Sequence, residues 1–167
     1  SGDTTVVTNV QNVDASAISA GSTITGSAGA NTITGGAGND VIDGGGGADI
    51  IAAGAGNDRI IVRGTEASID GGEGNDTLVL AAGSTVTAVN FAVASGVDQT
   101  AGDAASMVNF ENLEAGAMTT ALLVTGSSLA NSIMTGSGND TVHGGGGADT
   151  INAGAGNDTL DGGSGND

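Results

Sequence analysis

GGAGNDVIDGGGGADIIAAGAGNDRII, from Gly35 to Ile61, decides the fold because it is one nine-residue pattern written three times. Each unit has six residues that are rich in glycine and end in aspartate, followed by three residues whose middle member is isoleucine. Glycine permits the tight turns that the first part needs, and β-branched residues suit a short strand in the second. The nine-residue period therefore predicts a repeat architecture rather than a compact domain around one core.

The same frame continues on both sides of this stretch. GSAGANTIT precedes it from Gly26, and a degenerate unit at 62–70 and GGEGNDTLV at 71–79 follow it. The eighth position of every unit is a large aliphatic residue: Ile24, Ile33, Ile42, Ile51, Ile60, Ile69 and Leu78. A disordered low-complexity chain does not need such a frame, so we expect an ordered stack with an aliphatic ladder inside it.

A second block repeats the pattern 100 residues further along the chain. GGGGAD at 44–49 returns at 144–149, and AGAGND at 53–58 returns at 153–158. The segments before the repeats also correspond, NVQNVDA at 9–15 with NFENLEA at 109–115. We therefore expect a first module over 1–100, a second, truncated module over 101–167, and a parent protein that is a tandem array.

Each module is expected to contain segments of different kinds. Nonapeptides occupy 26–79 and 126–167, and an entry coil or cap of each module is expected at 1–25 and 101–125. Residues 80–100 lose the glycine frame and alternate apolar with polar side chains over 85–93, which predicts a capping strand. Phe91 and Phe110 are the two aromatic residues, and we expect them to close the hydrophobic stack. A ligand-binding patch at these two side chains is the alternative.

The charge balance limits the partners that the chain can have. Lys and Arg together number 2 against 19 acidic residues, for a net charge of −17. Such a chain repels nucleic acid and anionic lipid, so we expect neither nucleic-acid binding nor direct membrane insertion. Glycine accounts for 33 of 167 residues, which adds a large entropic cost to folding unless a ligand holds the loops. The lack of cysteine excludes disulfides and thiolate metal sites.

The loop aspartates are the candidate ligands of a metal ion. Glycine lets backbone carbonyl oxygens approach an ion closely, and aspartate adds carboxylate oxygens. Hard oxygen ligands at this density favour calcium over zinc, copper or magnesium. The candidate ligands are two glycines and the closing aspartate of each loop: Gly36, Gly38, Asp40, Gly45, Gly47, Asp49, Gly54, Gly56, Asp58, Gly72, Gly74, Asp76, Gly136, Gly138, Asp140, Gly145, Gly147, Asp149, Gly154, Gly156, Asp158, Gly163, Gly165 and Asp167.

The unit, with consensus GGxGxDxUx where U is a large aliphatic residue, resembles the nonapeptide repeat of RTX (repeats-in-toxin) proteins, whose calcium binding is established. The resemblance covers roughly residues 26–79 and 126–167. It implies an all-β fold, a right-handed parallel β-roll or β-helix solenoid with two nonapeptides in each turn. It also implies calcium ions between loops that are one turn, or 18 residues, apart on the same edge.

In this chain that spacing pairs Asp40 with Asp58, Asp58 with Asp76, Asp140 with Asp158, and Asp149 with Asp167. Three further positions depart from the pattern. Asp49 faces Ala67, with Glu66 beside it, and Asn31 and Asn131 stand where the upstream loops would need aspartate. We therefore expect about four well-formed calcium sites and at most about seven.

The residues of this chain favour a function without catalysis. We expect a calcium-binding structural module of a secreted bacterial cell-surface protein, most like an RTX-type S-layer protein or a large adhesin. Export by a type I system and folding in extracellular calcium follow from the same resemblance, and the open ends of the predicted roll favour self-assembly with copies of the parent protein. Against an enzyme, His143 is the single histidine and is expected in an exposed loop, and the carboxylates recur serially where an active site would be singular.

Two alternatives stay open. One is the C-terminal RTX secretion and folding domain of a secreted protease, lipase or toxin, against which the 100-residue duplication argues. The other is an adhesin that binds sugar or ice through ranks of threonine: Thr23, Thr32, Thr141, Thr150 and Thr159.

Overall fold

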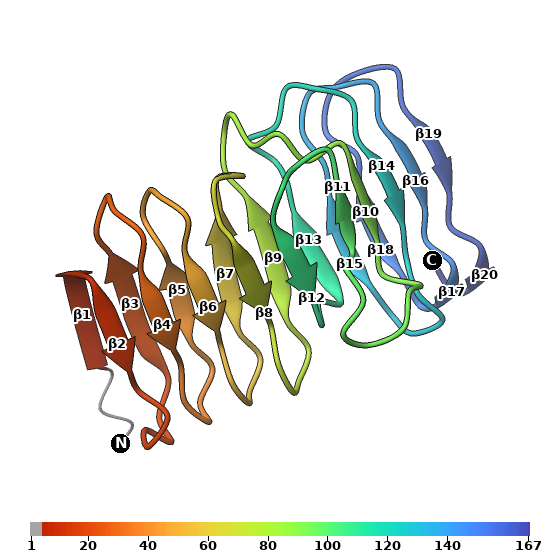
Figure 1. Ribbon diagram of the computed structural model, residues 1–167. Helices are drawn as coiled ribbons and strands as arrows, with labels where there is room; N and C mark the ends of the chain where they lie inside the picture. Colours follow the sequence, from red (N-terminus) through yellow and green to blue (C-terminus); the bar gives the residue numbers. More distant parts are fainter. Residues whose placement is uncertain (1–4) are drawn as a thin grey trace.

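Residues 5–167 form an elongated all-β solenoid, seen in a computed structural model (Figure 1). Residues 1–4 of the predicted first module lie outside the described residues. Short strands alternate with tight loops as the chain winds from β1 at one end to β20 at the other. Within 5–167, no helix has the length and apolar character needed to cross a membrane. The prediction of an all-β, parallel β-roll is confirmed.

One face of the solenoid is a single eight-stranded sheet that runs along the molecule. Neighbouring strands in it are parallel, as expected when each turn of the chain adds one strand to the same face. In order, its strands are β1 (Thr5–Val10), β3 (Ser22–Gly26), β5 (Val41–Asp43), β7 (Arg59–Val62), β9 (Thr77–Leu80), β13 (Asn112–Glu114), β15 (Ser132–Met134) and β18 (Thr150–Asn152).

The second face is made of two five-stranded sheets. The first contains β2 (Asn12–Asp14), β4 (Thr32–Thr34), β6 (Ile50–Ala52), β8 (Ser68–Asp70) and β12 (Ser106–Val108). The second contains β10 (Ala88–Asn90), β11 (Thr100–Ala101), β14 (Leu123–Thr125), β16 (Thr141–His143) and β19 (Thr159–Asp161). A further short pair, β17 (Gly146–Gly147) with β20 (Ser164–Gly165), joins two stacked glycine loops.

The aliphatic ladder predicted from the sequence forms the core between the two faces. In the three-residue strands the middle side chain points inward, and its neighbours point out or lie half-buried. Register stacks like residues: Ile24 lies beside Ile42 and Ile42 beside Ile60 on one face, and Ile33 lies beside Ile51 on the other. Burial of each such side chain contributes about 1.5–3 kcal/mol, which offsets part of the entropic cost of the glycine loops.

The chain turns back along the axis of the solenoid where the first module ends. After β9 it crosses to the second face as β10, returns as the antiparallel strand β11, and then forms β12 and β13. β12 pairs with β8 and β13 pairs with β9. Both strands therefore take positions beside the regular winding that β10 did not occupy. β14 then stacks on β10 and resumes the regular winding.

The structure differs from the expected strand in this region. The single strand expected over 85–93 is reduced to β10, because the chain turns at both ends of that strand. The leading segments contain strands of the solenoid, since β2 and β13 pair with the nonapeptide strands β4 and β9. Phe91 and Phe110 are 5% and 1% exposed, and both pack in the hydrophobic core. The Gln99 side chain holds both the N–H and the carbonyl of Phe110 at 2.8 Å.

The reversal shifts the second module by half a turn relative to the first. Ile33 lies on the second face in β4, whereas its counterpart Ile133 lies in β15 of the eight-stranded sheet. Equivalent loops of the two modules therefore lie on opposite edges of the solenoid. This offset decides which carboxylates share an edge.

Candidate metal sites

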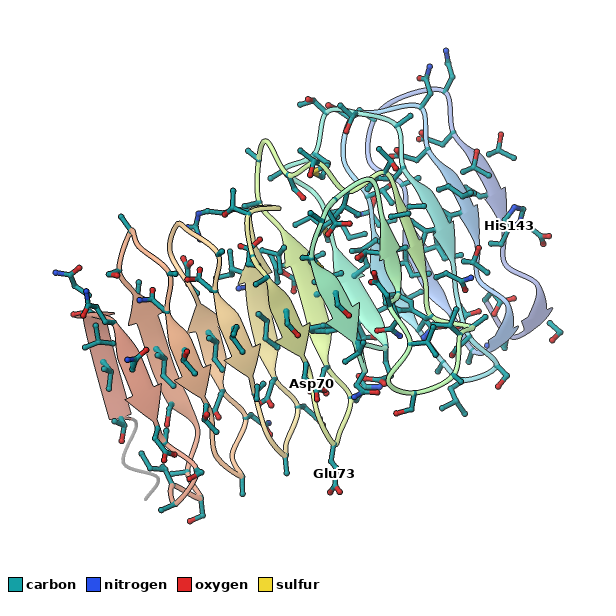
Figure 2. All side chains as sticks on the ribbon, viewed as in Figure 1. Asp70, Glu73 and His143 are labelled. Atoms are coloured by element: carbon teal, nitrogen blue, oxygen red, sulfur yellow. The ribbon has the colours of Figure 1, made fainter. Side chains whose placement is uncertain are left out.

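The loops lie along the two edges of the solenoid. On each edge, the last residues of successive loops stack in one column. Loops that lead into the eight-stranded sheet make the first edge, which carries Asp40, Asp58, Asp76, Glu111, Asn131, Asp149 and Asp167. Loops that lead out of this sheet make the second edge, which carries Asn31, Asp49, Ala67, Asp140 and Asp158. Figure 2 shows Glu73 at the tip of a first-edge loop, pointing away from the solenoid.

A repeated hydrogen bond connects each loop aspartate to the next one along its column. The backbone N–H of Asp40 donates to Oδ1 of Asp58 at 2.7 Å, and that of Asp58 donates to Oδ1 of Asp76 at 2.8 Å. In the second module the N–H of Asp140 reaches Asp158 at 2.9 Å, and the N–H of Asp149 reaches Asp167 at 3.0 Å. The structure thus brings together the four aspartate pairs that the 18-residue spacing predicts.

The second carboxylate oxygen is the part of each aspartate that indicates a ligand. Oδ2 is buried and has no hydrogen-bond partner in five of the loop aspartates: Asp49, Asp58, Asp76, Asp140 and Asp149. A buried anionic oxygen without a partner is costly, because it has lost its water and gained nothing in return. A cation bound to these oxygens removes that cost, so the residues fit calcium.

Burial also changes the acidity of these side chains. It raises the pKa of Asp49 and of Asp58, and it raises the pKa of Asp76 to about 7. Nearby carboxylates add to the shift, because Asp58, Glu111 and Asp70 all lie close to Asp76. Without a cation, these carboxyl groups therefore keep their protons to a higher pH than an exposed aspartate does.

The glycines bring backbone oxygens to the same places. A Cβ atom on Gly54 would collide with the carbonyl oxygen of Gly36, and one on Gly72 would collide with that of Gly54. The second glycine of the loop behaves alike, since Gly56 lies against Gly38 and Gly74 against Gly56. Each loop therefore presses its backbone on the carbonyl oxygens of the loop one turn before. Side chains alone do not make the sites, because residues 5–167 hold no group of three His, Cys, Asp or Glu suited to a metal.

The candidate glycines of the second module stack in the same way. Gly154 lies against the carbonyl oxygen of Gly136, and Gly156 lies against that of Gly138. On the other edge Gly163 lies against Gly145 and Gly165 against Gly147. Gly45 and Gly47 of the first module meet the backbone of the preceding loop at Ser27 and at Gly29 and Ala30.

The position opposite Asp49 lacks a ligand. Ala67 is level with Asp49, because its N–H donates to the carbonyl oxygen of Asp49 at 2.9 Å. Glu66 is buried beside it, but its carboxylate accepts the N–H groups of Arg63, Gly64 and Thr65 at 2.7–2.8 Å. This carboxylate therefore holds its own loop together.

Asparagine closes the first nonapeptide loop of each module, and its amide group donates to carbonyl oxygens. Nδ2 of Asn31 donates to the carbonyl oxygens of Val10 and Gln11 at 3.1 and 2.9 Å. Nδ2 of Asn131 donates to the carbonyl oxygen of Glu111 at 2.7 Å. The N–H groups thus serve oxygens that would otherwise need a cation, which favours asparagine over aspartate at these two positions.

The arginine side chains form their ion pairs with carboxylates other than those of the loop aspartates that have an unpartnered oxygen. Arg59 pairs with Glu114, and Arg63 pairs with Asp43. His143 was expected in an exposed loop; it is exposed, but it lies on β16, with Nδ1 3.8 Å from the carboxylate of Asp161 (Figure 2). In the described part of the chain, no arginine or histidine hydrogen-bonds to the unpartnered oxygens of the loop aspartates.

Glu111 is the residue of the first column that sequence reasoning missed. Its Oε2 accepts the backbone N–H of Asp76 at 2.8 Å, the same contact that Asp76 makes with Asp58. The sequence holds one weak signal, since Glu111 directly precedes a strand as the loop aspartates from Asp40 to Asp158 do. The signal is weak because 35 residues separate it from Asp76, in place of the regular 18.

Comparison with known families agrees with this geometry. A family model described as the RTX calcium-binding nonapeptide repeat (4 copies) matches residues 24–60, 68–86 and 125–167. These segments make up more than half of the chain and contain every candidate aspartate, whereas Glu111 lies outside them. No curated protein matches the chain.

Proposed function

The chain belongs to the RTX calcium-binding nonapeptide repeat family, and from this premise we propose that it is a structural module of a secreted bacterial cell-surface protein, of the S-layer or large-adhesin kind. The observation that carries the proposal is the pair of carboxylate columns with buried, unpartnered oxygens. Sites that repeat along a solenoid stabilise a shape, whereas an enzyme needs one singular site.

Calcium acts in this proposal by joining consecutive turns. Aspartate Oδ2 atoms and glycine carbonyl oxygens hold each ion between two loops of one edge. The ions offset the repulsion between carboxylates that stack roughly 5 Å apart, so calcium binding and folding are linked. Sites of the extracellular class bind calcium at about 10⁻⁴–10⁻³ M, which keeps the module unfolded inside a cell and folded outside it.

Self-assembly with copies of the parent protein is part of the proposal. The second module stacks on the first through the parallel strands β9 and β13, so a module can continue the ladder of another. Sheet edges that lack a partner pair readily with further strands. Light scattering tests this point: particles that grow with calcium and disperse with EDTA are expected, and a monomer at all calcium concentrations would contradict it.

The threonine ranks of the ice- or sugar-binding alternative receive little support from the register. Thr141 lies beside Thr159 on the second face, but Thr32 lies between Asn12 and Ile50. Thr23 lies between Val6 and Val41. Regular threonine arrays of more than two rungs therefore do not form at these positions.

Labelling of intact cells tests the cellular role. Antibodies against the module, applied to intact and to permeabilised cells of the producing organism, are expected to label the outer surface of the intact cells. Label that appears only after permeabilisation would contradict a surface role while leaving calcium binding untouched.

A further inference from the structure

At the junction between the two modules, the last nonapeptide loop of the first module stacks on a segment that is not a nonapeptide loop. The contacts there nevertheless match those between two stacked loops. Asn112 pairs with Thr77 in the β9–β13 register, so Glu111 stands level with Asp76. The N–H of Asp76 donates to Oε2 of Glu111 at 2.8 Å, as the N–H of Asp58 does to Asp76. Three residues, 109–111, thus take the place of a six-residue loop, and the longer side chain of glutamate reaches the position of an aspartate.

Two oxygens converge at this junction as they do within the regular loops. A Cβ atom on Gly35 would meet both Oδ2 of Asp40 and the carbonyl oxygen of Ala53 in the next turn. A Cβ atom on Gly71 would meet Oδ2 of Asp76 and the carbonyl oxygen of Asn109. Asn109 therefore supplies the backbone oxygen that the first residue of a regular loop supplies.

Asp76 gives the independent sign that a ligand belongs here. Its side chain is 0% exposed, and Oδ2 has no partner. Its nearby charged groups are Asp58, Glu111 and Asp70, all of them acidic. A buried carboxylate oxygen among three further carboxylates is stabilised by a cation.

The surroundings of Glu111 are fixed and leave room for water. Asn109 has a φ of +60°, and its side-chain amide donates to Asp70 at 2.7 Å and accepts from Ser95 at 2.6 Å. Glu111 and Asn109 line a cavity of about 200 Å³. Asp76 does not line this cavity, so the cavity is a source of water beside the ion: one water occupies about 30 Å³, and calcium takes six to eight oxygens.

We propose that Asp76, Glu111 and the carbonyl oxygen of Asn109 bind a calcium ion that joins the first module to the second. The inference rests on the proposed calcium-binding function and adds a site that the nine-residue repeat does not encode. Through it, the column of Asp40, Asp58 and Asp76 continues to Asn131, Asp149 and Asp167, since the carbonyl of Glu111 also receives the amide of Asn131. Calcium then sets the stacking of one module on the next.

Glu111→Gln tests the site with a residue that the chain itself uses. Gln11 holds the equivalent place in the first module, before Asn12 as Glu111 stands before Asn112. Glutamine still accepts the N–H of Asp76 but removes the charge. Glu73→Gln is the matched control, because Glu73 is an exposed acid at the tip of the loop that Asp76 closes (Figure 2).

Equilibrium dialysis with radioactive calcium gives the readout. Glu111→Gln is expected to bind one calcium ion fewer per chain than the parent or Glu73→Gln. Equal stoichiometry and equal affinity in all three proteins would overturn the junction site and leave the proposed function standing. A parent chain that binds no calcium would overturn both.

If Glu111→Gln does not fold, anomalous scattering by calcium in crystals of the unaltered chain tests the same site. Crystals of the unaltered chain grown in calcium are expected to show an anomalous peak about 2.3–2.6 Å from Oδ2 of Asp76 and from the Glu111 carboxylate. Peaks at the loop pairs without one at this position would overturn the inference.

Discussion

The backbone N–H of Asp58 donates a 2.8 Å hydrogen bond to Oδ1 of Asp76, 18 residues further along the chain. This bond takes up one carboxylate oxygen and leaves Oδ2 of Asp76 buried without a partner. The loop is therefore held in place by one oxygen, while the other remains for a cation. The same division recurs at Asp140 and Asp149, whose Oδ2 atoms are also unpartnered.

Asp58→Asn should weaken calcium-dependent folding more than the loss of a single surface charge. Asp58 lies between Asp40 and Asp76, so its carboxylate serves two neighbouring pairs. Asparagine keeps the hydrogen bond from Asp40 but removes the anionic oxygen, and we expect the calcium midpoint of folding to rise about tenfold or more, about 1.4 kcal/mol for each factor of ten. Circular dichroism during a calcium titration measures this midpoint. Asp161→Asn, at an exposed carboxylate, should leave it unchanged; equal shifts in both variants would contradict the ladder.

Gly72→Ala separates the collision with the neighbouring loop from backbone strain. Gly72 has a φ of +103°, and a Cβ atom there would strike the carbonyl oxygen of Gly54. Gly83 has a φ of +86°, and a Cβ atom there would meet nothing within 4 Å. Gly83→Ala should cost about 1–2 kcal/mol of unfolding free energy, and Gly72→Ala clearly more, with a loss of calcium affinity. Urea unfolding in saturating calcium measures the first effect; equal losses in the two variants would show that the loops do not press on one another.

Ile60→Ala should destabilise the fold without changing the number of bound ions. Ile60 is 0% exposed in the core, whereas Ile50 on β6 is 52% exposed. Removal of a buried isoleucine costs about 2–5 kcal/mol, so urea unfolding in calcium should show a loss of that size for Ile60→Ala. Ile50→Ala is the control and should stay within about 0.5 kcal/mol of the parent. Similar losses in both variants would contradict a core built from one inward-pointing aliphatic side chain in each nonapeptide.

Acid should partly replace calcium in the metal-free protein. Burial raises the pKa of Asp76 to about 7 and also raises the pKa values of Asp49 and Asp58, above their ordinary value of 3.8. Between about pH 4 and pH 7 the folded state therefore binds more protons than the unfolded state. The stability that these carboxyl groups contribute is lost as pH rises through this window. In EDTA, circular dichroism should show more β-structure at pH 5.5 than at pH 7. Less β-structure at pH 5.5 would contradict the burial of these carboxyl groups.

The regular part of the fold was predictable because every unit repeats the same local chemistry. Ile42, Ile51 and Ile60 mark the inward side of three strands, and the aspartate before each strand marks the side chain that closes the loop. The strict nine-residue spacing allows only one register between stacked strands, since a shift by one residue would turn the aliphatic side chains outward.

The junction could not be predicted because it has no such spacing. The reversal through β10, β11 and β12 includes pairing between β12 and the distant strand β8, and residues 80–108 lack the nine-residue frame that would indicate it. The place of Glu111 beside Asp76 follows from the register of Asn112 with Thr77, which appears only once the chain has folded back. The half-turn offset of the second module is a consequence of the same reversal.

Far-UV circular dichroism during a calcium titration of EDTA-treated protein, with magnesium as the control ion, tests the central claim most directly. Because the loop aspartates carry buried oxygens without partners, we expect a cooperative change from coil to β-structure with calcium and not with magnesium. A β-signal that is already complete in EDTA at pH 7, and that calcium leaves unchanged, would contradict the account.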